Sequence, residues 1–187
     1  DKKKIGYIVL ADKIREDSKS AIINLKKLNI TPVMVTGDNE ITAHAVAREM
    51  GIEKVYAGVK PDEKLTIVRE YQATGKKVLM IGDGINDAAS LKGADIGVAM
   101  GKGADLALDS ADIVNVKEGI SGLVHSIIIS INIFRIIKQN LFWAFLYNVL
   151  AIPMAMMGLL HPAISEGAMI FSSITVILNS LRLRKTD

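Results

Sequence analysis

The 187-residue chain contains no cysteine, so neither a disulfide nor a thiolate metal site can form within it. Aromatic residues are scarce at 5%, and the formal net charge is only +3 at pH 7. Because this basic excess is small and dispersed, we expect no nucleic-acid partner. The lysines at the start precede no apolar segment of signal-peptide or transit-peptide form.

Charge is almost absent from one long stretch. Between residues 141 and 181 the only charged residue is Glu166, whereas residues 1–140 carry 20 basic and 18 acidic residues. This shift predicts a water-soluble domain over 1–118, an amphipathic stalk helix over 119–140 and a membrane part over 141–187. Two transmembrane helices are expected there, at about 141–160 and 164–181, because about 20 helical residues span the hydrocarbon core.

Basic residues flank this apolar stretch on both sides. Arg135 and Lys138 precede it, and Arg182, Arg184 and Lys185 follow it. Cytoplasmic loops carry an excess of basic residues, so both ends of the predicted hairpin, and with them the soluble domain, are expected in the cytoplasm. The chain is therefore predicted to be an integral membrane protein, with the cell membrane as its location.

Short apolar runs alternate with helical patterns before the stalk. Alternation of this kind predicts an α/β fold, a doubly wound Rossmann-like domain with a mostly parallel sheet. In such sheets ligands bind beyond the carboxyl ends of the strands, and two of the predicted strands end in acidic, glycine-containing turns. The candidate strands are 5–10, 32–35, 54–57, 78–81, 96–99 and 113–116, and the candidate helices are 17–28, 40–50, 61–73 and 86–91.

The turn Gly-Asp-Gly-Ile-Asn-Asp at 82–87 is the strongest signal. Asp83 lies between two glycines at the strand end, and Asn86 and Asp87 follow one helical turn later. Proteins hold Mg²⁺ with one or two carboxylates plus phosphate oxygens and water, so Asp83 is the predicted direct ligand and Asn86 and Asp87 support it. The alternative is a plain turn with Asn86 as a helix cap, but a cap needs only one of these three side chains.

A second turn, Thr36-Gly37-Asp38, is suited to cradle phosphate oxygens ahead of a helix. Lys64 lies near the start of its predicted helix, where the helix dipole disfavours a cation unless a phosphate is near. Each feature alone is equally consistent with a plain turn or a solvated lysine. Together with the predicted Mg²⁺ site they indicate phosphoryl transfer, although no nucleophile is evident.

Residues 33–39, 61–64 and 80–114 resemble the phosphorylation domain of P-type ATPases, within the haloacid-dehalogenase superfamily. The resemblance implies that Asp83 binds Mg²⁺. It also implies that the chain takes part in ATP hydrolysis, with ATP bound mainly by segments outside it. This sequence has Ser90 where the family often has alanine. The implied phosphate contacts and catalytic residues are Thr36, Gly37, Asp38, Lys64, Asn86 and Asp87.

The family's phosphorylated aspartate lies in a DKTGT motif that this sequence lacks. We therefore expect the chain to correspond to roughly the last quarter of a pump, to be inactive alone, and to work with the remaining segments of the same ATPase in a lipid bilayer. Asp12-Lys13 is a partial match, but Ile14 follows it. Two alternatives stay open, a membrane-anchored phosphatase with Asp12 as nucleophile and a regulatory subunit with a degenerate site.

Polar residues interrupt the membrane part in two places. Tyr147-Asn148 precedes Pro153, which can open the helix backbone locally, and Met169, Ser172 and Ser173 share one helical face. Such residues often pack membrane helices together. As ligands, a thioether with neutral oxygen and amide groups suits Cu(I) better than Zn²⁺, Ca²⁺ or Mg²⁺.

The segments 147–153 and 169–173 resemble the last two helices of copper-transporting heavy-metal ATPases. The resemblance implies that Tyr147, Asn148, Met169 and Ser173 bind Cu⁺ during transport, with Ser172 a less certain member and a Cys-Pro-Cys motif outside this chain. Silver pumps share these motifs, whereas a zinc or cadmium pump is expected to carry an intramembrane aspartate, which is absent here. The implied function is ATP-driven Cu(I) export through Mg²⁺-dependent formation and hydrolysis of an aspartyl phosphate.

Overall fold

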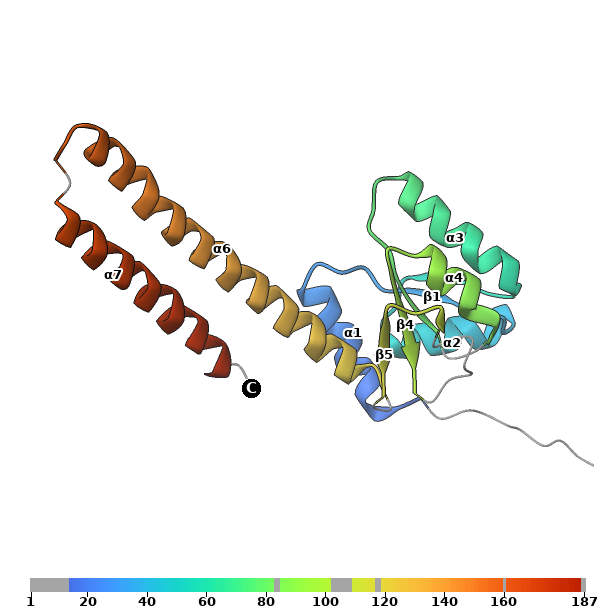
Figure 1. The fold of residues 1–187 in the computed structure, drawn as a ribbon. Helices are drawn as coiled ribbons and strands as arrows, with labels where there is room; N and C mark the ends of the chain where they lie inside the picture. Colours follow the sequence, from blue (N-terminus) through green and yellow to red (C-terminus); the bar gives the residue numbers. More distant parts are fainter. Residues whose placement is uncertain (1–13, 83–84, 102–108, 117–118, 160, 186–187) are drawn as a thin grey trace, which may run out of the picture. The chain divides into compact units, whose positions relative to one another are not determined.

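The computed structural model describes residues 14–82, 85–101, 109–116, 119–159 and 161–185 (Figure 1). The chain divides into two compact units, Asp1–Val124 and His125–Asp187, and each is described by itself. The predicted strand 5–10, Asp12 and Asp83 lie outside the described residues.

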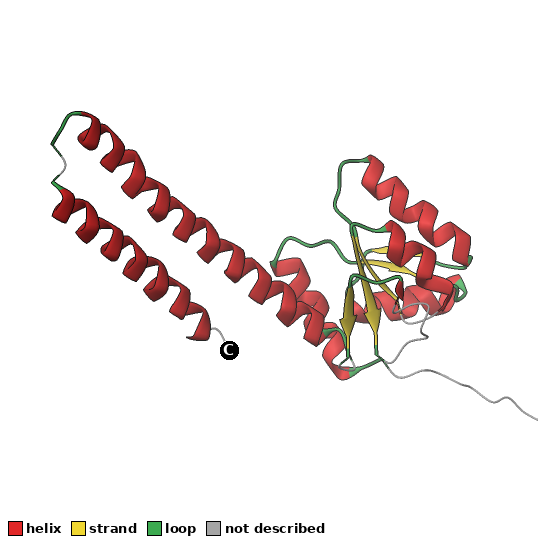
Figure 2. Cartoon of the chain, viewed as in Figure 1, coloured by secondary structure: helices red, strands yellow, loops and turns green. Residues whose placement is uncertain are grey.

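The first unit alternates helices with short strands, all of them paired in parallel (Figure 2). β1 pairs with β2 in one sheet, and β3, β4 and β5 follow one another in a second sheet. The predicted α/β class is confirmed. The elements are α1 (Glu16–Lys27), β1 (Val33–Val35), α2 (Glu40–Met50), β2 (Lys54–Tyr56), α3 (Pro61–Ala73), β3 (Leu79–Gly82), the 3-10 helix η1 (Ile85–Asp87), α4 (Ala88–Gly93), β4 (Ile96–Met100) and β5 (Ile113–Asn115).

Local signals set the limits of the helices that follow β1 and β2. Asn39 caps α2, because its side-chain oxygen accepts a hydrogen bond from the backbone N–H of Thr42 at 3.0 Å. The helix ends at Gly51, whose φ of 73° is left-handed. Pro61 occupies the first turn of α3, where its missing N–H costs nothing.

Helix α4 packs tightly against the second sheet. Leu91 of α4 and Val98 of β4 are fully buried. A Cβ on Gly97 would lie 2.5 Å from the carbonyl oxygen of Leu91, so only glycine allows this helix to approach β4 so closely. This packing holds η1, which leads into α4, beside the carboxyl end of β3.

The second unit is built by α6 (Ser121–Met156), which begins in the first unit, α7 (Pro162–Leu181) and the 3-10 helix η2 (Arg182–Lys185). Among the described residues, α6 is the one helix long and apolar enough to cross a membrane, and Glu166–Leu181 is a shorter apolar helix. α6 passes through Pro153 without a break, so the backbone opening expected there is absent.

α6 ends at Met156, four residues before the predicted end of the first span. Gly158 has a left-handed φ of 71°, and its N–H donates to the carbonyl of Ala155 at 3.0 Å. The N–H of Leu159 donates to the carbonyl of Met154 at 3.0 Å. These two bonds form the glycine-terminated motif that closes many helices.

Candidate active site

Lys64 and Asp87 form an ion pair beside the carboxyl end of β3. The Nζ of Lys64, on α3, lies 2.6 Å from Oδ1 of Asp87, at the end of η1. The two side chains are only 15% and 10% exposed, so both charges are largely withdrawn from water and depend on each other. The structure therefore brings together two of the predicted site residues, which are 23 positions apart in the sequence.

Gly82 leaves room for the carboxylate of Asp87. A Cβ on Gly82 would lie 2.5 Å from Cβ of Asp87 and 2.7 Å from its Oδ2. Gly82 is one of the two glycines that flank Asp83, and glycine in a turn often allows the backbone to approach a ligand closely. At Gly82 the close neighbour is instead Asp87 of the same chain.

The predicted Mg²⁺ site is only partly described, because Asp83 lies outside the described residues. Within the described parts of the chain, no three His, Cys, Asp or Glu side chains gather as a metal cluster. Asn86 is exposed and Asp87 is 7% exposed at the end of β3. Their amide and carboxylate oxygens are donors that Mg²⁺ prefers, so the donor set of this turn fits that ion.

The turn after β1 is held by its own side chains. The hydroxyl of Thr36 donates to a carboxylate oxygen of Asp38 at 3.0 Å, and the N–H of Asp38 donates to the same hydroxyl oxygen at 3.1 Å. A Cβ on Gly37 would make only an ordinary contact, 3.6 Å from the carbonyl oxygen of Val59. Space within the chain therefore does not require glycine at this position.

Backbone hydrogen bonds join this turn to the loop that leads into α3. The N–H of Val59 donates to the carbonyl of Thr36 at 3.0 Å, and the N–H of Gly58 donates to the carbonyl of Asp38 at 2.7 Å. Lys64 follows on the first turns of α3. The predicted phosphate turn and the helix that carries the predicted cation are thus tied together.

Ser90 forms a hydrogen bond to the last residue of η1. It is completely buried, and its hydroxyl donates to the carbonyl of Asp87 at 2.8 Å. In the sequence, Ser90 stands out only as a departure from the family pattern. Its spacing of three residues after Asp87 was the available signal, since side chains at this spacing reach the preceding turn.

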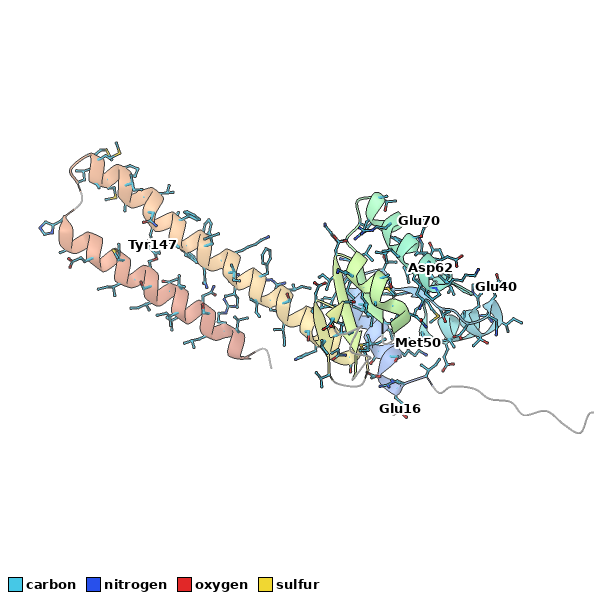
Figure 3. All side chains as sticks on the ribbon, turned by 45° about the vertical axis from the view of Figure 1, so that its right-hand side comes forward. Glu16, Glu40, Met50, Asp62, Glu70 and Tyr147 are labelled. Atoms are coloured by element: carbon cyan, nitrogen blue, oxygen red, sulfur yellow. The ribbon has the colours of Figure 1, made fainter. Side chains whose placement is uncertain are left out.

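In the second unit the helices α6 and α7 meet at the level of the predicted transport residues. Figure 3 labels Tyr147 on α6. Its ring is nearly perpendicular to that of Phe171 on α7, with centroids 6.2 Å apart. Asn148 donates to the carbonyl of Ala144 at 2.9 Å, so its amide group bonds its own helix.

On α7, the two predicted residues Met169 and Ser173 are linked by a hydrogen bond within the helix. The hydroxyl of Ser173 donates to the carbonyl of Met169 at 3.0 Å, and Met169 is 72% exposed. Ser172 is half-buried. The Tyr147–Phe171 ring pair joins the two helices near the predicted transport residues, whereas the side chains of Asn148 and Ser173 bond their own helices.

Comparisons with known proteins identify the family to which the chain belongs. The model of haloacid dehalogenase-like hydrolases matches residues 1–95. The chain belongs to this family of phosphoryl-handling α/β proteins.

Its relatives are P-type ATPases, as the sequence motifs predicted. The chain is 48% identical over 185 residues to "Probable copper-importing P-type ATPase A" of Enterococcus hirae, an alignment covering 97% of this chain and 25% of that protein. It is 44% identical over 180 residues to "Copper-exporting P-type ATPase" of Bacillus subtilis, covering 96% of this chain and 22% of the relative.

Among solved structures, a zinc-transporting PIB-type ATPase in its E2.Pi state matches 92% of this chain and 28% of its own. The TM-score is 0.83 at 34% identity. This match confirms the fold, with the α/β domain followed by the helical region. The chain spans about a quarter of the length of the curated relatives it matches.

Proposed function

We propose that this chain is the part of an ATP-driven Cu(I) export pump that handles the phosphoryl group and continues into the last two membrane helices. The observation that carries the proposal is the Lys64–Asp87 ion pair at the carboxyl end of β3, in a chain that also forms a long apolar helix. The proposed divisions are a phosphorylation domain over 1–118, a stalk over 119–140 and a transmembrane hairpin over 141–187.

The soluble residues have distinct proposed roles. Lys64 supplies a positive charge to the phosphoryl group, and Asp87 holds the ammonium group in place. The Thr36-Gly37-Asp38 turn contacts phosphate oxygens through its N–H groups, and Asn86 hydrogen-bonds the phosphorylated site. Asp83 would hold Mg²⁺ with support from Asp87, and the ion would supply positive charge against the phosphoryl oxygens when bound. The aspartate that accepts the phosphoryl group from ATP comes from another segment of the pump.

The membrane residues favour copper over zinc. Tyr147, Asn148, Met169 and Ser173 offer a thioether and neutral oxygen or amide donors, a set that suits Cu(I). Residues 141–181 contain no aspartate, the residue expected in the last helix of a zinc or cadmium pump. The solved zinc pump is therefore similar in fold, while the names of the sequence relatives support copper.

The printed names of two relatives give opposite directions, import and export. Export is proposed here, the direction printed for the Bacillus subtilis relative. Basic residues outside both ends of the apolar stretch favour a cytoplasmic phosphorylation domain, which is compatible with either direction, so the direction is decided by experiment.

The experiment that tests this proposal is ion uptake by inverted membrane vesicles carrying the full-length pump. We expect ATP-dependent accumulation of Cu⁺, because inversion exposes the cytoplasmic side, with Ag⁺ competing and Zn²⁺ giving no uptake. Uptake of Zn²⁺ but not Cu⁺ would contradict the proposed ion. Copper uptake confined to right-side-out vesicles would contradict the proposed direction.

A further inference from the structure

Four polar side chains join α6 and α7 at the ends away from their connecting turn. The Nδ2 of Asn140 donates to Oγ of Ser180 at 2.9 Å. The Nδ2 of Asn179 donates to Oδ1 of Asn140 at 2.8 Å and to Oε1 of Gln139 at 3.2 Å. We name Gln139, Asn140, Asn179 and Ser180 the amide clamp. None of these four residues belongs to a motif recognised from the sequence.

The amide clamp lies two helical turns from the predicted transport residues on both helices. Asn140 precedes Tyr147 by seven residues and Asn179 follows Ser172 by seven, a spacing that returns to the same face about 10 Å along a helix. Helices joined by a short turn run antiparallel, so residue numbers that increase along α6 lie opposite residue numbers that decrease along α7. The Tyr147–Phe171 contact agrees with the register that the clamp sets.

This register decides which transport residues share a level. Continuing the clamp pairing along both helices places Asn148 opposite residues 170–172. Met169 and Ser173 lie within one turn on either side of that level. The four residues proposed to bind Cu(I) therefore fall in one layer only if α6 and α7 keep this register.

The transport residues themselves do little to fix the register. The side chains of Asn148 and Ser173 bond carbonyls of their own helices. Apolar contacts in a membrane hairpin are not directional, and helices held by them alone tolerate sliding. A screw displacement of one helix by one residue, a shift of about 1.5 Å with a rotation of about 100°, would separate the clamp side chains from their partners.

We propose that the amide clamp consists of positioning residues for the copper site, which hold α6 and α7 in the register that brings Tyr147 and Asn148 level with Met169 and Ser173. This inference rests on the proposed function. The clamp residues lie in the second unit, whereas the Lys64–Asp87 pair lies in the first. Loosening the clamp should therefore weaken metal binding and leave the phosphoryl chemistry intact.

The test uses the full-length pump with Asn140→Ala, Asn179→Ala and the double variant. Two quantities are measured, the Cu⁺ concentration that half-activates ATP hydrolysis, with Cu⁺ kept reduced, and the amount of phosphoenzyme formed from inorganic phosphate. We expect each single variant to raise the half-activating concentration by about threefold to thirtyfold, with phosphoenzyme unchanged. The double variant should raise the half-activating concentration by less than the product of the two single effects, because both single variants remove the Asn140–Asn179 bond.

A matched control is Asn132→Ala, which removes an asparagine of α6 outside the clamp and should leave both quantities unchanged. Ser180→Ala removes only the hydroxyl that accepts from Asn140, and should shift the half-activating concentration less, in the same direction. The inference is overturned if all clamp variants keep the wild-type half-activating concentration, or if the two single effects multiply in the double variant. It is also overturned if all clamp variants, Ser180→Ala included, lose phosphoenzyme together with copper activation.

Failure of the inference can be told apart from failure of the proposed function by Met169→Leu. If Met169→Leu abolishes copper activation while the clamp variants leave it unchanged, only the clamp inference fails. If Met169→Leu also leaves copper activation unchanged, the copper site itself is wrong.

Discussion

Asp17 on α1 accepts a hydrogen bond from the backbone N–H of Ser121, the first residue of α6, at 3.2 Å across 104 positions of sequence. The first N–H groups of a helix lack partners within the helix, and a carboxylate there also meets the positive end of the helix dipole. Gly119, with φ of 102°, packs against the same carboxylate. Asp17 therefore anchors the start of α6 to α1 within the first unit.

Removing this anchor should destabilise the chain. We expect Asp17→Ala to lower the midpoint of thermal unfolding by a few degrees, because the first turn of α6 loses its acceptor. Asp17→Asn keeps an acceptor oxygen, so its unfolding midpoint should fall by less than that of Asp17→Ala. Calorimetry of the purified protein in detergent measures both, and equal midpoints for wild type and Asp17→Ala would contradict the anchoring role.

Asp95 makes stability depend on pH. Its carboxylate accepts from Lys77 Nζ at 2.8 Å, from the N–H of Val78 at 3.0 Å and from Gln72 at 3.1 Å. The hydrogen bond from Lys77, followed by those from Val78 and Gln72, lowers the pKa of Asp95 below its ordinary range. A lowered folded-state pKa gives stability that is present above the ordinary aspartate pKa, about 3.9, and is lost as pH falls through the folded value.

The variant Asp95→Asn should therefore unfold at a lower temperature than wild type at pH 6, with a smaller gap below pH 3. Calorimetric scans across this range measure the gap. A gap that stays constant or grows toward low pH would show that the charge of Asp95 does not stabilise the fold.

Glycine is required for packing at position 82, whereas at position 37 we expect it to be required for the approach of phosphate. Gly82→Ala should displace Asp87 and reduce phosphoenzyme formation from inorganic phosphate by at least about tenfold, because the new methyl overlaps the Asp87 side chain. The added methyl group of Gly37→Ala fits within the chain, so the folded structure should be preserved. A loss of phosphoenzyme in this variant would therefore show that the methyl group hinders the approach of phosphate. Wild-type phosphoenzyme levels in Gly82→Ala would contradict the packing role assigned to that glycine.

The Lys64–Asp87 pair should show strong coupling. Lys64→Met leaves the largely buried carboxylate of Asp87 unpaired, which should cost about 3 kcal/mol of unfolding free energy. Combining it with Asp87→Asn removes the unpaired charge and should recover most of that loss, while phosphoenzyme formation stays absent. Denaturant unfolding and phosphorylation assays measure the two effects, and a double variant whose losses simply add would show that the pair is not coupled.

The sequence predicted the repeating pattern of the fold because strand and helix periods are local. The Gly-Asp-Gly-Ile-Asn-Asp turn and Lys64 were predicted as site residues for the same reason, since each lies at a fixed place relative to its own strand or helix. Their pairing across α3 and η1 was not predictable from spacing, because it depends on how α3 and α4 pack together.

Other contacts lay beyond local patterns altogether. The bond between Asp17 and Ser121 joins residues from opposite ends of the first unit. The amide clamp depends on the register of two antiparallel helices, which composition does not reveal. Pro153 lacks a backbone N–H and was expected to open α6 locally, but the helix continues on both sides of it.

The most direct test of the central claim compares Met169→Leu with wild type in the full-length pump, measuring Cu⁺-stimulated ATP hydrolysis and phosphoenzyme formed from inorganic phosphate. Leucine keeps the apolar volume of the side chain and removes the thioether. The account predicts that copper-stimulated hydrolysis is lost while phosphoenzyme from inorganic phosphate still forms. Unchanged copper-stimulated hydrolysis would contradict it.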